Sequence, residues 1–143
     1  MPSEYERFSY ALHNTARIWR LALDRRMKDL GISQAGWLAI AYIAKASGPM
    51  SQSELAGLVQ VEAATMVSTL DRLERASLVI RVASDTDRRV KHLKLTPEGQ
   101  AIYEKVRGRA TEMREEMLAG IDTEKLAAAT DILEQLQKLI ENS

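Results

Sequence analysis

Residues 63–99 read AATMVSTLDRLERASLVIRVASDTDRRVKHLKLTPEG, and this stretch decides the fold because its hydrophobic period changes partway along. The first part carries Met66, Leu70 and Leu73 at helical spacing, which predicts a helix over residues 62–76. Four polar side chains fall on a separate face of the same helix: Thr65, Ser68, Thr69 and Arg72. The helix therefore has one face suited to a core and one face with hydrogen-bonding groups.

The second part of the stretch predicts a β-hairpin with a charged tip. Apolar and polar residues alternate there, with Ile80 and Val82 before the tip and Leu93 and Leu95 after it. The tip contains acidic and basic side chains: Asp85, Asp87, Arg88 and Arg89. Thr96 and Pro97 then suit the N-cap and the first position of another helix.

A short helix is predicted immediately before the amphipathic one. Ser51 and Glu54 have the spacing of a capping box, and we expect Leu55, Leu58 and Val59 to face inward. A tight turn at residues 60–61 then joins the two helices, which is the arrangement of a helix-turn-helix unit. The hairpin that follows makes it a winged helix-turn-helix.

Long helices are predicted at both ends of the chain. Ser3 and Glu6 form a capping box for a first helix that continues to Gly31, a second helix starts at Ser33, and a last helix follows Gly120. We therefore expect a mainly α (α+β) fold in a single domain, 1–143. Its DNA-binding helix-turn-helix and wing span 51–96, and helices 1–31 and 100–143 form a dimerisation region. The apolar stripes of these terminal helices exceed what a 143-residue fold buries by itself, which favours a homodimer over a monomeric bundle.

Composition excludes several classes of protein. The absence of cysteine rules out disulfides and thiolate metal sites, and His13 and His92 are the only histidines. We therefore expect no enzyme, no catalytic residues, no metal site and no cofactor. No apolar run is long enough to span a membrane and the first residues lack the pattern of a secretion signal, so we expect a cytoplasmic protein.

Charge is unevenly distributed although the net charge is zero. Residues 71–94 have a net charge of +3, whereas residues 98–143 have a net charge of −4. Because local charge determines where a polyanion docks, the basic segment is the candidate partner surface for double-stranded DNA.

The polar helix face and the hairpin tip have the chemistry of a DNA-binding site. The major groove admits one α-helix, whose polar side chains match the donors and acceptors of the base edges. Arg88 and Arg89 suit phosphates or a narrow minor groove, and Asp87 is spaced to brace the Arg89 guanidinium. The alternatives are that the tip is an ordinary solvated turn and that the chain is a helical protein-interaction module without DNA binding.

These residues resemble the MarR family of transcriptional regulators. Residues 85–99 are similar to the wing and following helix start of the family, and Leu70-Asp71-Arg72-Leu73-Glu74 is similar to the end of its recognition helix. Arg17-Ile18-Trp19-Arg20, Asp24 and Trp37 further resemble the SlyA branch. Two positions depart from the pattern: Ser68 replaces a frequent basic residue, and Ser77 replaces the usual glycine before the first wing strand.

The resemblance implies a repressor that a small aromatic carboxylate or phenolic ligand releases from DNA. The family's ligand crevice lies between the dimerisation helices and the winged domain, where Arg17 would pair with a carboxylate and Trp37 would stack on a ring. Ala35 and Ala41 stand where SlyA relatives offer polar side chains. The structural interpretation, with Trp37 in the core and Arg17 as a surface or interface charge, is equally open.

Overall fold

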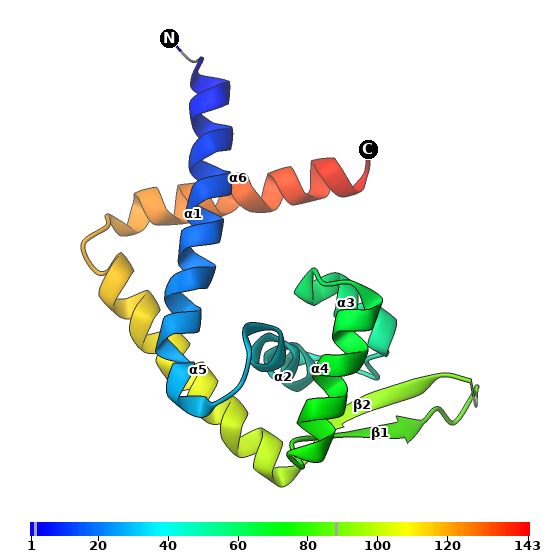
Figure 1. Ribbon diagram of the computed structural model, residues 1–143. Coiled ribbons are helices and arrows are strands. Elements are labelled where there is room, and N and C mark those ends of the chain that lie inside the picture. The colour runs from blue at the N-terminus through cyan, green and yellow to red at the C-terminus, as the bar shows by residue number, and fades with distance from the viewer. Residues whose placement is uncertain (2, 88) are drawn as a thin grey trace. The chain divides into compact units, whose positions relative to one another are not determined.

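Helices make up most of the chain, and one two-stranded antiparallel sheet accompanies them (Figure 1). The computed structural model describes residues 1, 3–87 and 89–143. In chain order its elements are α1 (Glu4–Arg26), the 3-10 helix η1 (Lys28–Leu30), α2 (Gln34–Lys45), α3 (Gln52–Val59), α4 (Ala63–Arg75), β1 (Val79–Ala83), β2 (Lys91–Leu95), α5 (Pro97–Leu118) and α6 (Thr123–Glu141). The predicted fold class, mainly helical with a small antiparallel hairpin, is confirmed.

The chain divides into two compact units, Met1–Ala110 and Thr111–Ser143, and the boundary falls within α5. The first unit holds α1 to β2 and the start of α5. The second holds the rest of α5 together with α6, none of whose residues is buried. Within the described residues, no helix has the length and apolar character that crossing a membrane requires.

Side-chain caps fix where most of the predicted helices begin. The hydroxyl oxygens of Ser3, Ser33 and Ser51 each accept a hydrogen bond from the amide three residues later, at 3.1–3.2 Å. The first helix is shorter than predicted, because α1 ends at Arg26 and a 3-10 turn leads to Gly31 in the left-handed conformation (φ 69°). Glycine at that position has no steric penalty, so the turn is inexpensive.

The main core lies between α2, α3, α4 and the hairpin. Its buried residues are Ala39, Ile40, Ile43, Met50, Leu55, Ala56, Val59, Met66, Leu70, Leu73, Leu78, Val79 and Leu93. The predicted inward position of Leu58 is wrong, because its side chain lies about 100° around α3 from Val59 and is 42% exposed. Ala56 takes the inward position instead.

The hairpin pairs Val79 with Leu95 and Arg81 with Leu93, which puts these four residues on the face toward the core. The predicted hairpin is present, and the alternation places Val79 in the core, whereas Ile80 is 44% exposed. Arg81 occupies an inner position, where its charge is paired by α4. A third segment joins the edge of the sheet, since the Leu93 amide donates to the Met50 carbonyl at 3.0 Å.

A second, smaller core contains Met27, Trp37 and Val106. Nearby, the Arg109 guanidinium donates to the Arg26 carbonyl at 3.1 Å and to both carboxylate oxygens of Asp29. These bonds satisfy the end of α1 and attach it to α5. The hydrogen bond from Arg109 also holds the pKa of the Asp29 carboxyl below its usual value.

Candidate nucleic-acid interface

The polar face of α4 is available because the opposite face is in the core. Met66, Leu70 and Leu73 have exposed fractions of 0–4%, as the helical spacing predicts. The sharp turn into α4 comes from Gln60, which adopts the left-handed conformation (φ 65°), and Glu62 is its N-cap. This geometry turns one side of α4 outward next to the hairpin (Figure 1).

Three of the four predicted α4 residues lie on that outward side. Thr65, Ser68 and Arg72 are exposed. The prediction that Thr69 shares this face is wrong, because Thr69 is buried with 7% of its surface exposed. Its direction is only about 40° around the helix from that of Leu73, so it belongs to the edge of the core-facing side.

Arg81 joins the wing to α4, a role that the sequence reasoning missed. Its two terminal nitrogens lie 2.9 Å from Asp71 Oδ1 and 2.9 Å from Glu74 Oε2, and its side chain is 20% exposed. The sequence did contain a signal for this role. Arg81 is a charged residue within a strand, and Asp71 and Glu74 lie one helical turn apart on the preceding helix. The pairing ties β1 to α4 and offsets part of the negative charge of these two carboxylates, which belong to α4.

The wing tip contains the brace that the sequence predicts. Asp87 Oδ1 accepts hydrogen bonds from the Arg89 amide at 3.0 Å and from Arg89 Nε at 3.3 Å, and Oδ2 lies 3.5 Å from the second guanidinium nitrogen. The Arg89 side chain is 91% exposed, so its guanidinium extends into solvent while it is paired. Arg88, also predicted to contact DNA, lies outside the described residues.

The base of the wing is held by Ser77 and Thr96. Ser77 has φ 62°, so this serine adopts the left-handed conformation for which a glycine is normal. Its carbonyl accepts the Thr96 hydroxyl at 2.6 Å, and Thr96 Oγ1 in turn accepts the Gly99 amide at 3.0 Å. The predicted Thr96 cap is confirmed, and it also anchors the wing to the start of α5.

Arg17 and Trp37, the two predicted ligand contacts, occupy different environments. Arg17 lines a pocket of about 400 Å³ formed by His13, Ala16, Arg17, Arg20, Leu21, Gln34 and Gln60. Trp37 is not among its lining residues: it is 3% exposed, and its indole nitrogen donates to Asp24 Oδ1 at 2.9 Å. The burial of Trp37 favours its structural interpretation, and its ligand role stays a prediction.

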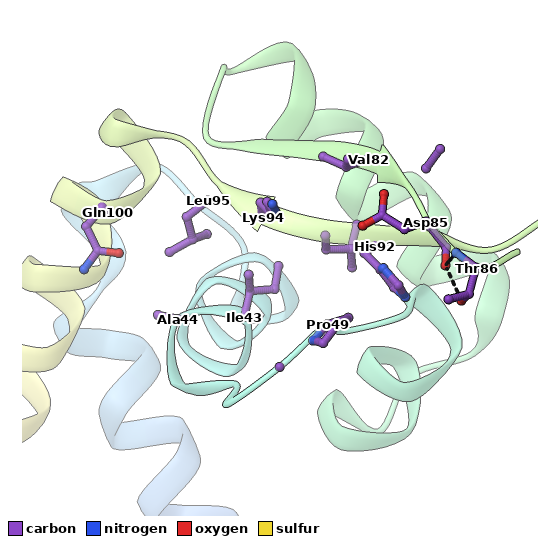
Figure 2. Close-up of a pocket in the computed structure, with 14 residues that line it drawn as sticks. Ile43, Ala44, Pro49, Val82, Asp85, Thr86, His92, Lys94, Leu95 and Gln100 are labelled. Carbon is purple, nitrogen blue, oxygen red and sulfur yellow. Dashed lines mark hydrogen bonds between the residues drawn. The ribbon is translucent and has the colours of Figure 1, made fainter. Parts of the chain in front are cut away.

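A larger pocket of about 650 Å³ lies along β2, at the side of the hairpin that faces the end of α2. Figure 2 shows Ile43 and Pro49 on one side of it and Val82, His92 and Lys94 on the other, with Thr86 at the wing end. Among the predicted site residues that the structure describes, none lines this pocket. Its lining is mixed in polarity and does not gather groups of one charge.

Comparisons with known proteins agree with this geometry. The model of the MarR family matches residues 37–91. The solved transcriptional regulator PA3341 is 38% identical, with a TM-score of 0.88, and the alignment covers 95% of this chain and 99% of that one. A MarR-family regulator from Silicibacter pomeroyi is 27% identical (TM-score 0.77; 94% and 88% covered). Streptococcus pneumoniae FabT, solved in complex with DNA, is 25% identical (TM-score 0.77; 97% and 99% covered).

Proposed function

The chain belongs to the MarR family of transcriptional regulators, and from this premise we propose that it regulates transcription by binding double-stranded DNA through α4 and the wing. The family consists of regulators and not of enzymes, in agreement with the sequence. The observation that carries the proposal is the pairing of an outward polar helix face with a braced, exposed arginine on the adjacent wing. FabT, a relative of similar fold, was solved bound to DNA, which supports the proposal over a protein-interaction module.

In the proposed complex, α4 enters the major groove. Its 13 residues make a rod about 20 Å long, and the diameter of an α-helix with its side chains, about 10–12 Å, fits a groove about 12 Å wide. Thr65 and Ser68 supply hydrogen-bonding groups to base edges, and Arg72 supplies a charged donor. We leave Thr69 out of the reading face because the core covers it.

In the same complex, the wing binds the neighbouring minor groove. The negative potential of this groove attracts a guanidinium, and the Arg89 side chain extends into solvent at the wing tip. The Asp87 pair restricts the guanidinium before DNA arrives, so less side-chain freedom is lost on binding. Arg88 remains a second proposed contact at the same tip.

A second copy of the chain covers the terminal helices in this proposal. Neither α1 nor α6 has a buried residue. Each exposes large apolar side chains: Tyr5, Tyr10 and Ile18 on α1, and Ile132, Leu139 and Ile140 on α6. A symmetric dimer removes them from water and presents two α4 helices to a pseudo-palindromic site with half-site centres about 10 base pairs apart.

The ligand part of the proposal concerns the Arg17 pocket. Arg17 and Arg20 supply two guanidinium groups and His13 an imidazole to one cavity of about 400 Å³, which suits a small aromatic carboxylate or phenol. Such a ligand would release the DNA, so the protein would act as a repressor in the cytoplasm, close to the SlyA branch. Arg17→Ala is expected to remove the ligand response and leave DNA affinity within about 2-fold.

The test is selection of bound fragments from a genomic library, followed by fluorescence anisotropy on the selected duplex. The logarithm of the association constant should fall linearly with the logarithm of the salt concentration. Arg89→Ala should reduce the magnitude of this slope by about one. Arg107→Ala, an equally charged change at an exposed position on α5, is the matched control and should leave the slope unchanged. Failure to select any fragment, or an affinity independent of salt, would contradict DNA binding.

A further inference from the structure

Ser84 is a buried polar residue at the end of β1, where the wing tip begins. Only 9% of its surface is exposed. Its amide donates to the Val90 carbonyl at 2.9 Å, which closes the tip across the hairpin. Its hydroxyl oxygen accepts the amides of Thr86 at 3.2 Å and Asp87 at 3.3 Å, and lies 3.1 Å from the Thr86 hydroxyl. One side chain therefore holds two successive backbone amides of the turn.

The same turn determines the direction of Asp87. Its amide is held by Ser84, and its carbonyl accepts the Val90 amide at 3.1 Å. With the backbone of Asp87 fixed at both ends, its carboxylate reaches the amide and the guanidinium of Arg89. The contacts therefore form a relay that runs from Ser84 through Asp87 to Arg89.

From this relay we propose that Ser84 is a positioning residue for the wing's DNA contact, an inference that rests on the proposed function. Ser84 is too buried to reach DNA and carries no charge. Its effect comes from restricting the turn, so that Arg89 loses less conformational freedom when DNA binds. Without the hydroxyl, the amides of Thr86 and Asp87 lose their acceptor and the carboxylate is no longer held toward Arg89.

A double-mutant cycle between Ser84→Ala and Arg89→Ala tests the proposal with the full-length protein and the duplex selected by the wild type. Ser84→Ala is expected to weaken binding by about 3- to 10-fold, the effect typical of one lost hydrogen-bonding partner. Its salt slope should match that of the wild type because no charge is lost. In the Arg89→Ala background, Ser84→Ala should lower the DNA affinity by less than about 2-fold, since the guanidinium that Ser84 positions is absent.

Variants that keep a hydrogen-bond acceptor at residue 84 distinguish a positioning role from a general disturbance of the wing. Ser84→Thr retains the hydroxyl and Ser84→Asn supplies a carbonyl oxygen, and at least one should bind within about 2-fold of the wild type. Ser47→Ala, the same change in an exposed loop outside the wing, is the control and should have no effect. Additive effects of Ser84→Ala and Arg89→Ala, or weak binding by both acceptor variants, would overturn the proposal.

A measurement without DNA distinguishes this inference from the proposed function. The Arg89 amide is bonded to the Asp87 carboxylate, so its hydrogen exchange should accelerate in Ser84→Ala and stay unchanged in Ser47→Ala. Unchanged Arg89 exchange would refute the relay even if the protein binds DNA. Faster exchange in a protein that selects no DNA would support the relay and refute the function.

Discussion

Substituting Gly99 tests how the base of the wing is fixed to α5. A Cβ built on Gly99 would lie well inside 3.0 Å of the Leu78 carbonyl oxygen, 3.0 Å from its carbonyl carbon and 3.4 Å from its Cα. All three atoms are backbone, so rotation of a side chain cannot relieve the clash. The Leu78 carbonyl also accepts the Thr96 amide at 3.1 Å, and this bond must lengthen if the carbonyl moves.

The expected cost follows from these contacts. Overpacking against rigid neighbours costs about 1–3 kcal/mol, and the weakened hydrogen bond adds about 1 kcal/mol. The better helix propensity of alanine offsets about 0.5–1 kcal/mol. Gly99→Ala should therefore destabilise the protein by about 1–3.5 kcal/mol, which lowers Tm by roughly 2–14 °C for a chain of this size.

Calorimetry at fixed protein concentration measures this change, because association makes Tm depend on concentration. Gly57→Ala in α3 is the matched control: its Cβ would meet nothing within 4 Å, so it should raise stability by about 0.5–1 kcal/mol. The two identical substitutions should therefore shift Tm in opposite directions. An unchanged or higher Tm for Gly99→Ala would refute the close approach between Leu78 and α5.

Three further changes test the wing, its entry turn and the α1–α5 attachment. Asp87→Ala should weaken DNA binding by about 2- to 5-fold although it removes a negative charge, because Arg89 loses its brace; tighter binding in anisotropy would mean that repulsion dominates. Ser77→Gly should raise the free energy of unfolding by up to about 1 kcal/mol in urea titrations, since a left-handed serine is strained; a loss of stability would contradict that strain. The lowered pKa of Asp29 means that its pair with Arg109 stabilises the protein above the unfolded pKa of about 4, a contribution lost as pH falls through the folded value. The Tm difference between wild type and Asp29→Asn should therefore be present at pH 6 and shrink below pH 4, and a constant difference would refute the assignment.

Features set by short-range physics were predictable from the sequence. A helix cap depends only on a hydroxyl side chain three residues before the amide that it accepts. The structure contains this hydrogen bond at four helix starts: Ser3, Ser33, Ser51 and Thr96. The Asp87–Arg89 pair likewise spans two residues of one turn. In all these cases the partner is fixed by spacing along the chain, so sequence position is enough.

Features that depend on tertiary partners were not predictable in the same way. Thr69 and Leu58 lie at the borders of amphipathic faces, where a rotation of a few tens of degrees decides burial. The inner position of Arg81 requires knowing that Asp71 and Glu74 lie across from it. The indole nitrogen of Trp37 donates a hydrogen bond to Asp24, which lies 13 residues away on another helix. Hydrophobic periodicity cannot indicate a partner of this kind.

Arg81 changes the net charge that α4 and the wing carry together. The helix α4 carries Asp71 and Glu74 beside Arg72 and Arg75, so its local charges would cancel if all four faced solvent alike. Arg81 pairs with both acids from the wing, so the two acids and the three arginines together carry a net charge of +1. Arg72 and Arg75 remain exposed on α4. In the proposed complex, a net charge of zero gives little long-range attraction to DNA, so the affinity would depend on docking α4 and the wing together. The same ion pairs that set the charge also hold these two elements in one orientation, so a change at Arg81 should reduce discrimination between duplexes more than it reduces attraction to DNA in general.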